Sequence, residues 1–139
     1  MVFFLTTTRV KKVSDNGSEK KQSERNLFKA VNFADAETQT IEQLSAFYQE
    51  LTVINIKMVE YGDVFPSDDE FRERWFEVVT SLIMLDLRTG KESKTKYNVL
   101  VQAKDIDDAI SLFHEKMKGS MMDYEVRHCR LTGIVEVHV

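Results

Sequence analysis

The segment Tyr97-Asn98-Val99-Leu100-Val101-Gln102-Ala103-Lys104-Asp105-Ile106-Asp107-Asp108-Ala109 changes from a strand-like pattern to a helical one at Asp105. Asp105 is a typical N-cap residue, because its side chain can accept a hydrogen bond from a free N–H group of the first helical turn. A similar corner occurs 73 residues earlier, where Asn32 corresponds to Asp105 and Asp35-Ala36 to Asp108-Ala109. The sequence therefore indicates two copies of one structural unit.

The similarity between the two halves extends toward the N-terminus. Without a gap, the offset of 73 gives nine identities between residues 3 and 36, where average residue usage predicts about two. The identical positions are Phe3, Thr7, Gly17, Glu19, Lys21, Leu27, Ala30, Asp35 and Ala36. We therefore expect two tandem ββαβ pseudo-repeats, residues 1–65 and 74–139, joined by a linker at residues 66–73.

Hydrophobic periodicity predicts the elements of each copy. The expected strands cover residues 2–13, 25–31 and 51–61 in the first copy, and residues 75–87, 97–103 and 124–131 in the second. The first helix follows the cap at Asn32 and has an apolar stripe from Phe33 to Tyr48. The second helix begins after Asp105, and we expect Gly119 to end it in a left-handed conformation.

The order of the strands follows from the handedness of the helical connection. If the helix returns the chain parallel to the second strand, the third strand lies beside the first, which gives the order 2-1-3 in each copy. We expect an α+β fold with mostly antiparallel sheet and two helices. Because about 65 residues bury little surface alone, we expect the copies to share one core in a single domain, 1–139, as one continuous sheet or as two packed layers.

The composition and the N-terminal segment indicate the cellular compartment of the protein. The chain of 139 residues is 42% apolar and has a net charge of -4, which gives no global attraction to nucleic acid or anionic lipid. Cys129 is the only cysteine, which favours a reducing compartment. The apolar start Val2-Phe3-Phe4-Leu5 is too short for a signal peptide or a membrane span. We expect a cytoplasmic protein without a membrane partner.

Sequence motifs for catalysis, metals or cofactors are missing. The soft metal ligands are His114, His128, His138 and Cys129, and their spacing does not match a zinc site. The pair Asp107-Asp108 lies in an expected first helical turn, where acidic residues interact favourably with the helix dipole. The sequence has no glycine-rich phosphate loop. We therefore expect no enzymatic activity, no metal and no cofactor.

Basic residues gather in the two expected hairpins. Residues 9–29 contain seven bases and three acids, and the second hairpin again has more bases than acids. The candidate nucleic-acid-binding residues are Arg9, Lys11, Lys12, Lys20, Lys21, Arg25, Lys91, Lys94 and Lys96. Two basic ribbons at related positions can contact phosphates. The alternative is that these residues protect strand edges from aggregation.

Several stretches resemble an uncharacterised family, one of the domains of unknown function found in Bacteroides-type gut bacteria and their phages. The matching stretches are Asn16-Gly17, Lys20-Lys21, Phe33-Ala34-Asp35-Ala36-Glu37, Tyr61-Gly62-Asp63-Val64-Phe65, Leu100-Val101-Gln102-Ala103 and Met117-Lys118-Gly119-Ser120-Met121-Met122-Asp123-Tyr124-Glu125-Val126. Family members usually begin with a Trp-Phe pair, where this chain has Val2-Phe3-Phe4. The resemblance implies a setting in gut bacteria or their phages, and the family has no established activity that could be carried over to this chain.

Three functional hypotheses follow. The first is a non-enzymatic binding module of a phage or mobile-element setting that contacts nucleic acid through the two basic hairpins. The second is a structural or assembly subunit, such as a virion component, that associates with a protein partner or with itself through strand edges and Val2-Phe3-Phe4-Leu5. The third is a protein that sequesters a small ligand in a pocket between the two copies.

Overall fold

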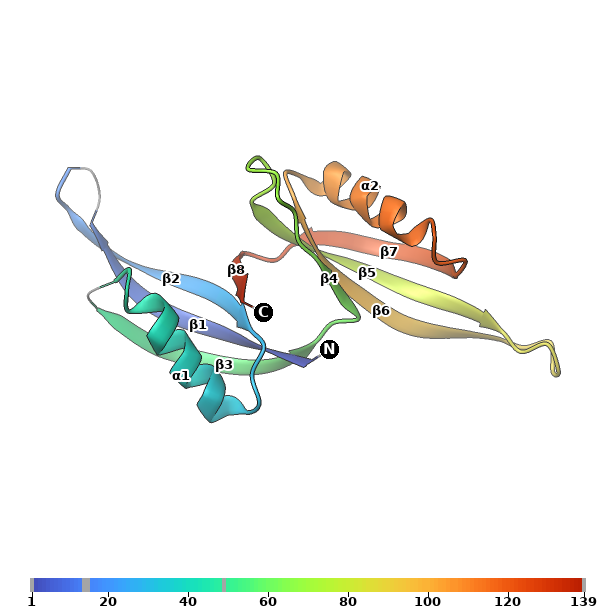
Figure 1. Cartoon of the computed structure of the whole chain (residues 1–139), viewed down its shortest axis with the longest axis horizontal. Coiled ribbons are helices and arrows are strands. Elements are labelled where there is room, and N and C mark those ends of the chain that lie inside the picture. The colour runs from blue at the N-terminus through green and yellow to red at the C-terminus, as the bar shows by residue number, and fades with distance from the viewer. Residues whose placement is uncertain (1, 14–15, 49, 139) are drawn as a thin grey trace. The chain divides into compact units, whose positions relative to one another are not determined.

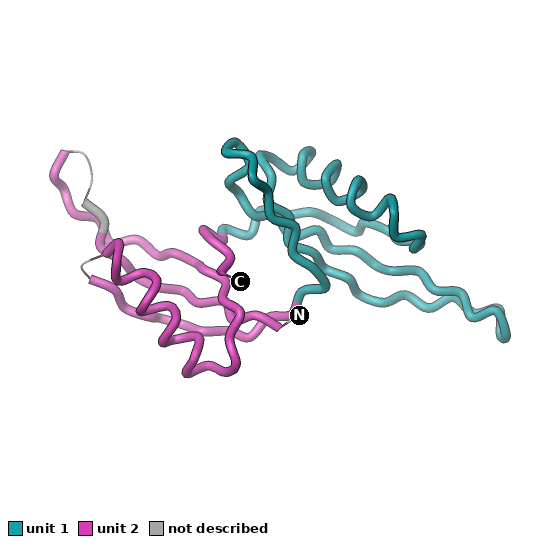
Figure 2. Tube along the Cα trace, viewed as in Figure 1, with its two compact units in different colours: residues 1, 61–133 teal, residues 2–60, 134–139 magenta. Residues whose placement is uncertain are grey.

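The computed structural model describes residues 2–13, 16–48 and 50–138, without the side chains of Lys12 and Val13. The chain divides into two compact units, shown in different colours in Figure 2. Unit 1 contains residues 61–133, and unit 2 contains residues 2–60 and 134–139. Each unit has one four-stranded sheet and one helix, so the predicted α+β fold is confirmed, with two sheets instead of one continuous sheet. A core shared between the copies stays a prediction.

Unit 2 is built mainly from the first copy. Its elements are β1 (Val2–Val13), β2 (Glu19–Phe28), α1 (Phe33–Leu44), β3 (Leu51–Glu60) and β8 (Ile134–His138). The sheet has the order β3-β1-β2-β8, and α1 lies across one face of it (Figure 1). β1 is antiparallel to both β2 and β3. The helix therefore connects two parallel strands across β1, as the predicted 2-1-3 order requires.

Unit 1 repeats this arrangement. Its elements are β4 (Asp63–Phe65), β5 (Arg74–Leu85), β6 (Glu92–Ala103), α2 (Ile106–Met117) and β7 (Asp123–Leu131). The sheet has the order β4-β6-β5-β7, and β5 is antiparallel to both β6 and β7. The long apolar segment of β5 thus forms an inner strand, and most of its first half is buried. The predicted 2-1-3 order is confirmed in both copies.

Both helices begin with the same pair of hydrogen bonds. Oδ1 of Asn32 accepts a bond of 2.8 Å from the backbone N–H of Asp35, and Oδ2 of Asp35 accepts one of 2.9 Å from the backbone N–H of Val31. Asp105 and Asp108 accept the equivalent bonds in unit 1. These side chains satisfy backbone donors that have no partner inside the helix, so the predicted caps are confirmed.

The ends of the helices differ from the prediction. α1 ends at Leu44, several residues before Tyr48. Gly119 has no positive φ, and the left-handed residue is Met121, with φ 56°. In α2 the carbonyl of Met117 accepts hydrogen bonds from both the N–H and the Oγ of Ser120. These bonds satisfy a free carbonyl of the last turn, so the helix ends without a left-handed glycine.

The strand register corrects the alignment of the two copies. Phe28 and Val101 are 73 residues apart, but their partners on the preceding strands, Phe4 and Phe76, are 72 apart. The hairpin loop is therefore one residue longer in the second copy. The gapless alignment wrongly matched Phe3 with Phe76, whose structural equivalent is Phe4. The error was not visible in the count of identities, because residues 3 and 4 are both phenylalanine. A β-bulge beside Thr8 and Thr80 follows the same 72-residue offset.

The fourth strand of each sheet comes from the other half of the sequence. β4 follows β3 along the chain but pairs in parallel with β6, and β8 follows β7 but pairs in parallel with β2. The boundaries of the compact units at 60/61 and 133/134 therefore assign β4 and β8 to the unit formed by the other half of the sequence. Asp63 faces Val99, and Glu136 faces Asn26. Both pairs are related by the 73-residue offset, so the duplication includes the strand exchange.

The apolar N-terminal segment is part of the interior. Phe3, Phe4 and Leu5 have exposed fractions of 0%, 3% and 7%, and they belong to β1, which has a neighbour on each side. A buried inner strand presents no free backbone groups to another chain. Phe3, Phe4 and Leu5 are therefore covered within unit 2, whereas Val2 is 46% exposed, and assembly through strand edges stays a prediction.

Candidate functional site

The predicted basic residues are distributed over both hairpins. Arg9, Lys20, Lys21, Arg25, Lys91, Lys94 and Lys96 are exposed. Lys11 is partly buried and lies 2.8 Å from Glu19. Lys94 lies 3.2 Å from Glu125. The side chain of Lys12 is outside the described part of the chain.

The internal repeat relates only one pair of these residues. Lys21 corresponds to Lys94 by the 73-residue offset, whereas serines correspond to Arg9 and Lys96. The two hairpins therefore carry most of their basic residues at non-equivalent positions, and binding of nucleic acid by them stays a prediction. Within unit 2, Lys21 and Arg25 occupy alternate positions of β2, so they lie on one face of the sheet. Arg9 pairs with Ser23, which places it on the same face.

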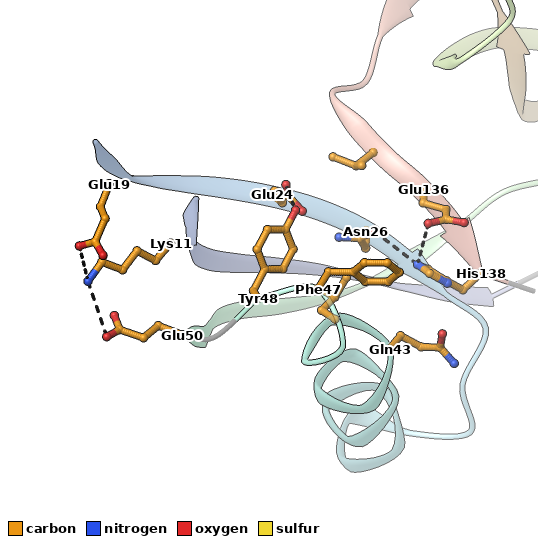
Figure 3. Close-up of a pocket in the computed structure, with 12 residues that line it drawn as sticks. Lys11, Glu19, Glu24, Asn26, Gln43, Phe47, Tyr48, Glu50, Glu136 and His138 are labelled. Carbon is orange, nitrogen blue, oxygen red and sulfur yellow. Dashed lines mark hydrogen bonds and ion pairs between the residues drawn. The ribbon is translucent and has the colours of Figure 1, made fainter. Parts of the chain in front are cut away.

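The structure contains a pocket in unit 2 that the sequence did not predict at this place. Its volume is about 790 Å³, within the usual range for small-molecule sites. It lies beside the end of α1 and includes residues from β2 and β8 (Figure 3). The lining residues are Lys11, Glu19, Glu24, Asn26, Gln43, Leu44, Phe47, Tyr48, Glu50, Val135, Glu136 and His138. The sequence had placed a ligand pocket between the two copies, whereas this one lies within a single unit.

A hydrogen-bonded carboxylate forms one side of the pocket. The hydroxyl of Tyr48 donates a bond of 2.6 Å to Oε1 of Glu24, and the side-chain amide of Gln22 donates one of 3.2 Å to the same oxygen. Glu24 is 7% exposed. Burial and, to a smaller extent, the bond and charge of Glu24 raise the pKa of Tyr48 to about 12. Tyr48 therefore remains a hydrogen-bond donor at neutral pH.

A buried amide forms the floor. Asn26 is 1% exposed, and its Oδ1 lies 3.4 Å from Nε2 of His138. The imidazole of His138 stacks on the ring of Phe28, with centroids 4.3 Å apart and planes at 3°. Burial lowers the pKa of His138, and the charge of Glu136 opposes this shift in part. His138 is thus neutral at neutral pH and can donate to Asn26.

The other amide atom of Asn26 lacks a partner. Nδ2 is buried and makes no hydrogen bond to any described residue. A buried polar atom without a partner costs about 1–3 kcal/mol, so native proteins rarely retain one without a reason. In Figure 3 the amide of Asn26 lies between His138 and Tyr48, with its nitrogen turned away from His138. A bound ligand in this pocket can supply the missing acceptor.

The interior of unit 2 is more polar than that of unit 1 at equivalent positions. In unit 1, Phe113 of α2 packs in a core cluster with Val78 and Val99. The equivalent residues in unit 2 are Thr40, Thr6 and Asn26, by offsets of 73, 72 and 73. Each of the three is smaller or more polar than its counterpart, and each is fully or almost fully buried. The corresponding part of unit 2 is therefore more polar than the unit 1 core, and of these three residues Asn26 lines the pocket.

Ion pairs form the rim of the pocket. Nζ of Lys11 lies 2.8 Å from a carboxylate oxygen of Glu19 and 3.8 Å from one of Glu50. The hydrogen bond and the charge of Glu19 raise the pKa of Lys11, and Glu50 adds to this. Both carboxylates are largely exposed, so solvent screens these pairs and their contribution to stability is small.

The other candidate groups form no reactive cluster. Among residues 2–13, 16–48 and 50–138, no group of three or more His, Cys, Asp or Glu side chains can hold a metal ion. Nδ1 of His114 lies 2.6 Å from the hydroxyl of Tyr124. Cys129 is partly buried in β7, and this burial raises the pKa of its thiol. In the described part of the chain, neither helix is long and apolar enough to span a membrane.

Sequence reasoning missed the residues that matter most in this pocket. Glu24, Asn26 and Tyr48 looked like ordinary members of a strand and a helix, and His138 was considered only as a metal ligand. A usable signal was present in the repeat. Positions at which one copy is apolar and the other polar, such as Val99 and Asn26, indicate where the two copies have diverged in role.

Comparison with known proteins gives one family. The family model of DUF4494, a domain of unknown function, matches residues 2–139. No curated protein sequence and no solved structure has significant similarity to the chain.

Proposed function

The chain belongs to the DUF4494 family, a domain of unknown function. We propose that it binds a small polar ligand in the pocket of unit 2. The proposal is for binding without catalysis, in the cytoplasm of a Bacteroides-type gut bacterium or in the setting of its phages. The resemblance and the single cysteine favour this location. One observation carries the proposal, namely the buried Nδ2 of Asn26, which lacks a partner among the described residues in the wall of a ligand-sized cavity.

The contrast between the copies supports a functional reason for this amide. Val99 occupies the equivalent position of unit 1 in the same fold, and it is fully buried in a well-packed cluster. Valine at residue 26 therefore suits the backbone, and stability alone does not require an amide there. Buried polar groups that weaken a fold are typical of sites that recognise a ligand.

The variant Asn26→Val tests the proposal. A thermal-shift screen with a broad metabolite library is carried out on the wild type and on the variant. A bound ligand at a hundred times its Kd stabilises the wild type by about 2.7 kcal/mol. We expect ligands that raise the Tm of the wild type to have little effect on Asn26→Val. The Tm of this variant without ligand shows whether it is folded, since the replacement removes both the unpaired Nδ2 and the bond between Oδ1 and His138.

Asn98→Val is the matched control. Asn98 also has a buried side-chain atom without a partner among the described residues, Oδ1, but it is on β6 in unit 1 and does not line the pocket. Its replacement should leave every ligand-induced shift unchanged. The proposal fails if the library contains no compound that stabilises the wild type, or if the shifts persist in Asn26→Val.

Nucleic-acid binding is the second candidate function. Its support is that Arg9, Lys21 and Arg25 share one face of the unit 2 sheet and are exposed. The variant with all three changed to Glu should bind less to a heparin or DNA column than the wild type, and its residual retention should depend less on salt. The control is Lys91→Glu with Lys96→Glu in unit 1. Equal retention of all three proteins removes this function.

A further inference from the structure

We propose that the ligand of the unit 2 pocket is a small organic cation, an amine or a guanidinium compound, whose charged group binds Glu24. This inference rests on the proposed binding function and adds the chemical class of the ligand. It follows from the partners of Glu24, from the charges around the pocket and from the aromatic residues in its wall.

Glu24 is a buried carboxylate without a cationic partner among the described residues. Both of its hydrogen bonds, from Tyr48 and Gln22, reach Oε1. Oε2 accepts neither of these bonds and is not among the fully buried atoms that lack a partner, so it is accessible from the pocket side. Removing a carboxylate from water is unfavourable unless a cation or several donors compensate for the loss. The nearby cation, Lys11, is already bound to Glu19 and Glu50. A cationic ligand can therefore supply the charge that Glu24 lacks.

The charged residues that line the pocket also favour a cationic ligand. Among the described lining residues, four are glutamates and one is a lysine. The glutamates are Glu19, Glu24, Glu50 and Glu136. A concave surface with charges of one sign concentrates ligands of the opposite sign. The same charges disfavour phosphates and carboxylates, so nucleotides are poor candidates for this pocket.

Aromatic residues give the cation a second type of contact. Phe47 is 79% exposed as a residue although it lines the pocket, and Figure 3 shows its ring beside Tyr48 and below Asn26. Cations bind favourably above aromatic faces within about 6 Å of the ring centre. Leu44 adds an apolar surface for an alkyl segment. A ligand with a charged end, a short hydrocarbon part and a hydrogen-bond acceptor for Asn26 would match all these groups.

Calorimetric titration with probes of matched length but different charge tests the inference. 5-Aminopentan-1-ol and 4-guanidinobutan-1-ol are the cationic probes, each with a hydroxyl that can accept a bond from Asn26; pentane-1,5-diol is the neutral probe and glutarate the anionic one. We expect a cationic probe to bind, glutarate not to bind, and added salt to weaken the binding. Glu24→Gln should weaken it about tenfold or more, which corresponds to the loss of one charged hydrogen bond. Glu125→Gln, which removes an exposed carboxylate of unit 1, should have no effect.

The possible failures are distinguishable. If neither cation binds at millimolar concentration, or if Glu24→Gln binds them as well as the wild type does, the cation assignment is wrong. It is also wrong if the diol or glutarate binds more tightly than the cations. The metabolite screen with Asn26→Val separately decides whether the pocket binds any ligand. A non-cationic compound that needs Asn26 would leave the binding function standing and remove only the charge class.

Discussion

His138 occupies in unit 2 the position that Phe65 occupies in unit 1. Phe65 pairs with Val101, and His138 pairs with Phe28, which is the equivalent residue 73 positions earlier. In unit 1 the ring of Phe65 packs 6.4 Å from that of Phe113. In unit 2 the helix has a threonine in place of Phe113, and the imidazole of His138 stacks on Phe28 instead. The strand exchange therefore places an apolar side chain in one unit and a polar one in the other.

The replacement His138→Phe should remove a pH dependence of stability. Burial lowers the pKa of His138 below its ordinary value of 6.5. Below that value, the unfolded chain binds a proton that the folded chain resists, so stability decreases as the pH falls from about 6.5 through the folded pKa. Above it the group is neutral in both states and has no effect. Urea unfolding at about pH 7 and about pH 5 should show a smaller acid-induced loss in His138→Phe than in the wild type.

A control separates this effect from the other histidines. His128 is exposed on β7, so His128→Gln should retain the acid sensitivity of the wild type. If His138→Phe and the wild type lose the same stability between the two pH values, then protonation of His138 does not oppose folding, and burial does not lower its pKa.

The C-terminal strand β8 should stabilise unit 2 strongly, although it has only five residues. Ile134 is 5% exposed, and His138 covers Phe28, which is fully buried. A chain that ends at Gly133 exposes both the ring of Phe28 and the edge of β2. We expect its free energy of unfolding to fall by at least about 2 kcal/mol, the value of one large buried apolar side chain. Urea unfolding monitored by circular dichroism measures this change.

The point variant Glu136→Ala is the control for the truncation. Its side chain is 68% exposed, so we expect a change within about 0.5 kcal/mol. The truncated chain should also aggregate more readily, because β2 becomes an unprotected edge. Equal stability of the truncated and complete chains would mean that β8 does not contribute to the fold of unit 2.

Local patterns were enough to predict the repeated part of the fold. The caps at Asn32 and Asp105 depend on side chains that bond to backbone groups three residues away, so sequence alone reveals them. The 2-1-3 order then follows from the handedness of helical crossovers. The register could not be predicted in the same way, since Phe3 and Phe4 are identical residues and a one-residue difference between the hairpin loops leaves no trace in the identities.

The exchange of strands between the two halves could not be found by periodicity. β4 has only three residues, Asp63–Phe65, and lies next to Pro66, so it reads as part of a linker. Its partner is β6 of the other copy, and nothing in the local sequence identifies a distant parallel partner. The pocket was missed for a related reason, because Asn26 becomes significant only when its burial and its counterpart Val99 are known.

The acidic residues at the two helix starts should contribute unequally to stability. Asp108 caps a backbone N–H as Asp35 does, but it also accepts two bonds from the guanidinium of Arg72, at 3.0 and 3.3 Å. Asp35 instead accepts a bond from the amide of Gln39. Removing the cap function costs about 1 kcal/mol. We expect Asp108→Ala to destabilise the protein by about 1 kcal/mol more than Asp35→Ala, because the ion pair is only partly screened.

This difference should disappear in acid. Burial alone would raise the pKa of Asp108, but the backbone N–H of Lys104 and the guanidinium of Arg72 outweigh it and lower the pKa below the usual 3.8. The stabilisation is therefore present above the unfolded pKa and is lost as the pH falls through the folded value. Urea unfolding of both variants at neutral pH and at stepwise lower pH values measures the change. A difference that is independent of pH would contradict an ionic origin.

Gly62, which follows β3, is predicted to tolerate no side chain. A Cβ added to this residue would lie 2.4 Å from Cδ1 and 2.5 Å from Cε1 of Tyr97. The backbone N–H of Gly62 is fixed by a bond of 2.7 Å to the carbonyl of Asn98, so the backbone cannot easily move away. Tyr97 packs against the unit 1 core and has to shift. We expect Gly62→Ala to lower the free energy of unfolding by about 1–3 kcal/mol, the usual cost of overpacking.

Gly119→Ala provides the opposite expectation at the end of α2. No neighbouring atom lies within 4 Å of the place that an alanine methyl group would occupy, and Gly119 has no positive φ. Alanine should therefore be neutral or stabilise by up to about 1 kcal/mol, since it restricts the unfolded chain. Thermal or urea unfolding of the two variants gives the comparison directly. If Gly62→Ala is as stable as Gly119→Ala, the ring of Tyr97 can move away from Gly62 at no cost. The contact between them then does not fix the backbone that precedes β4.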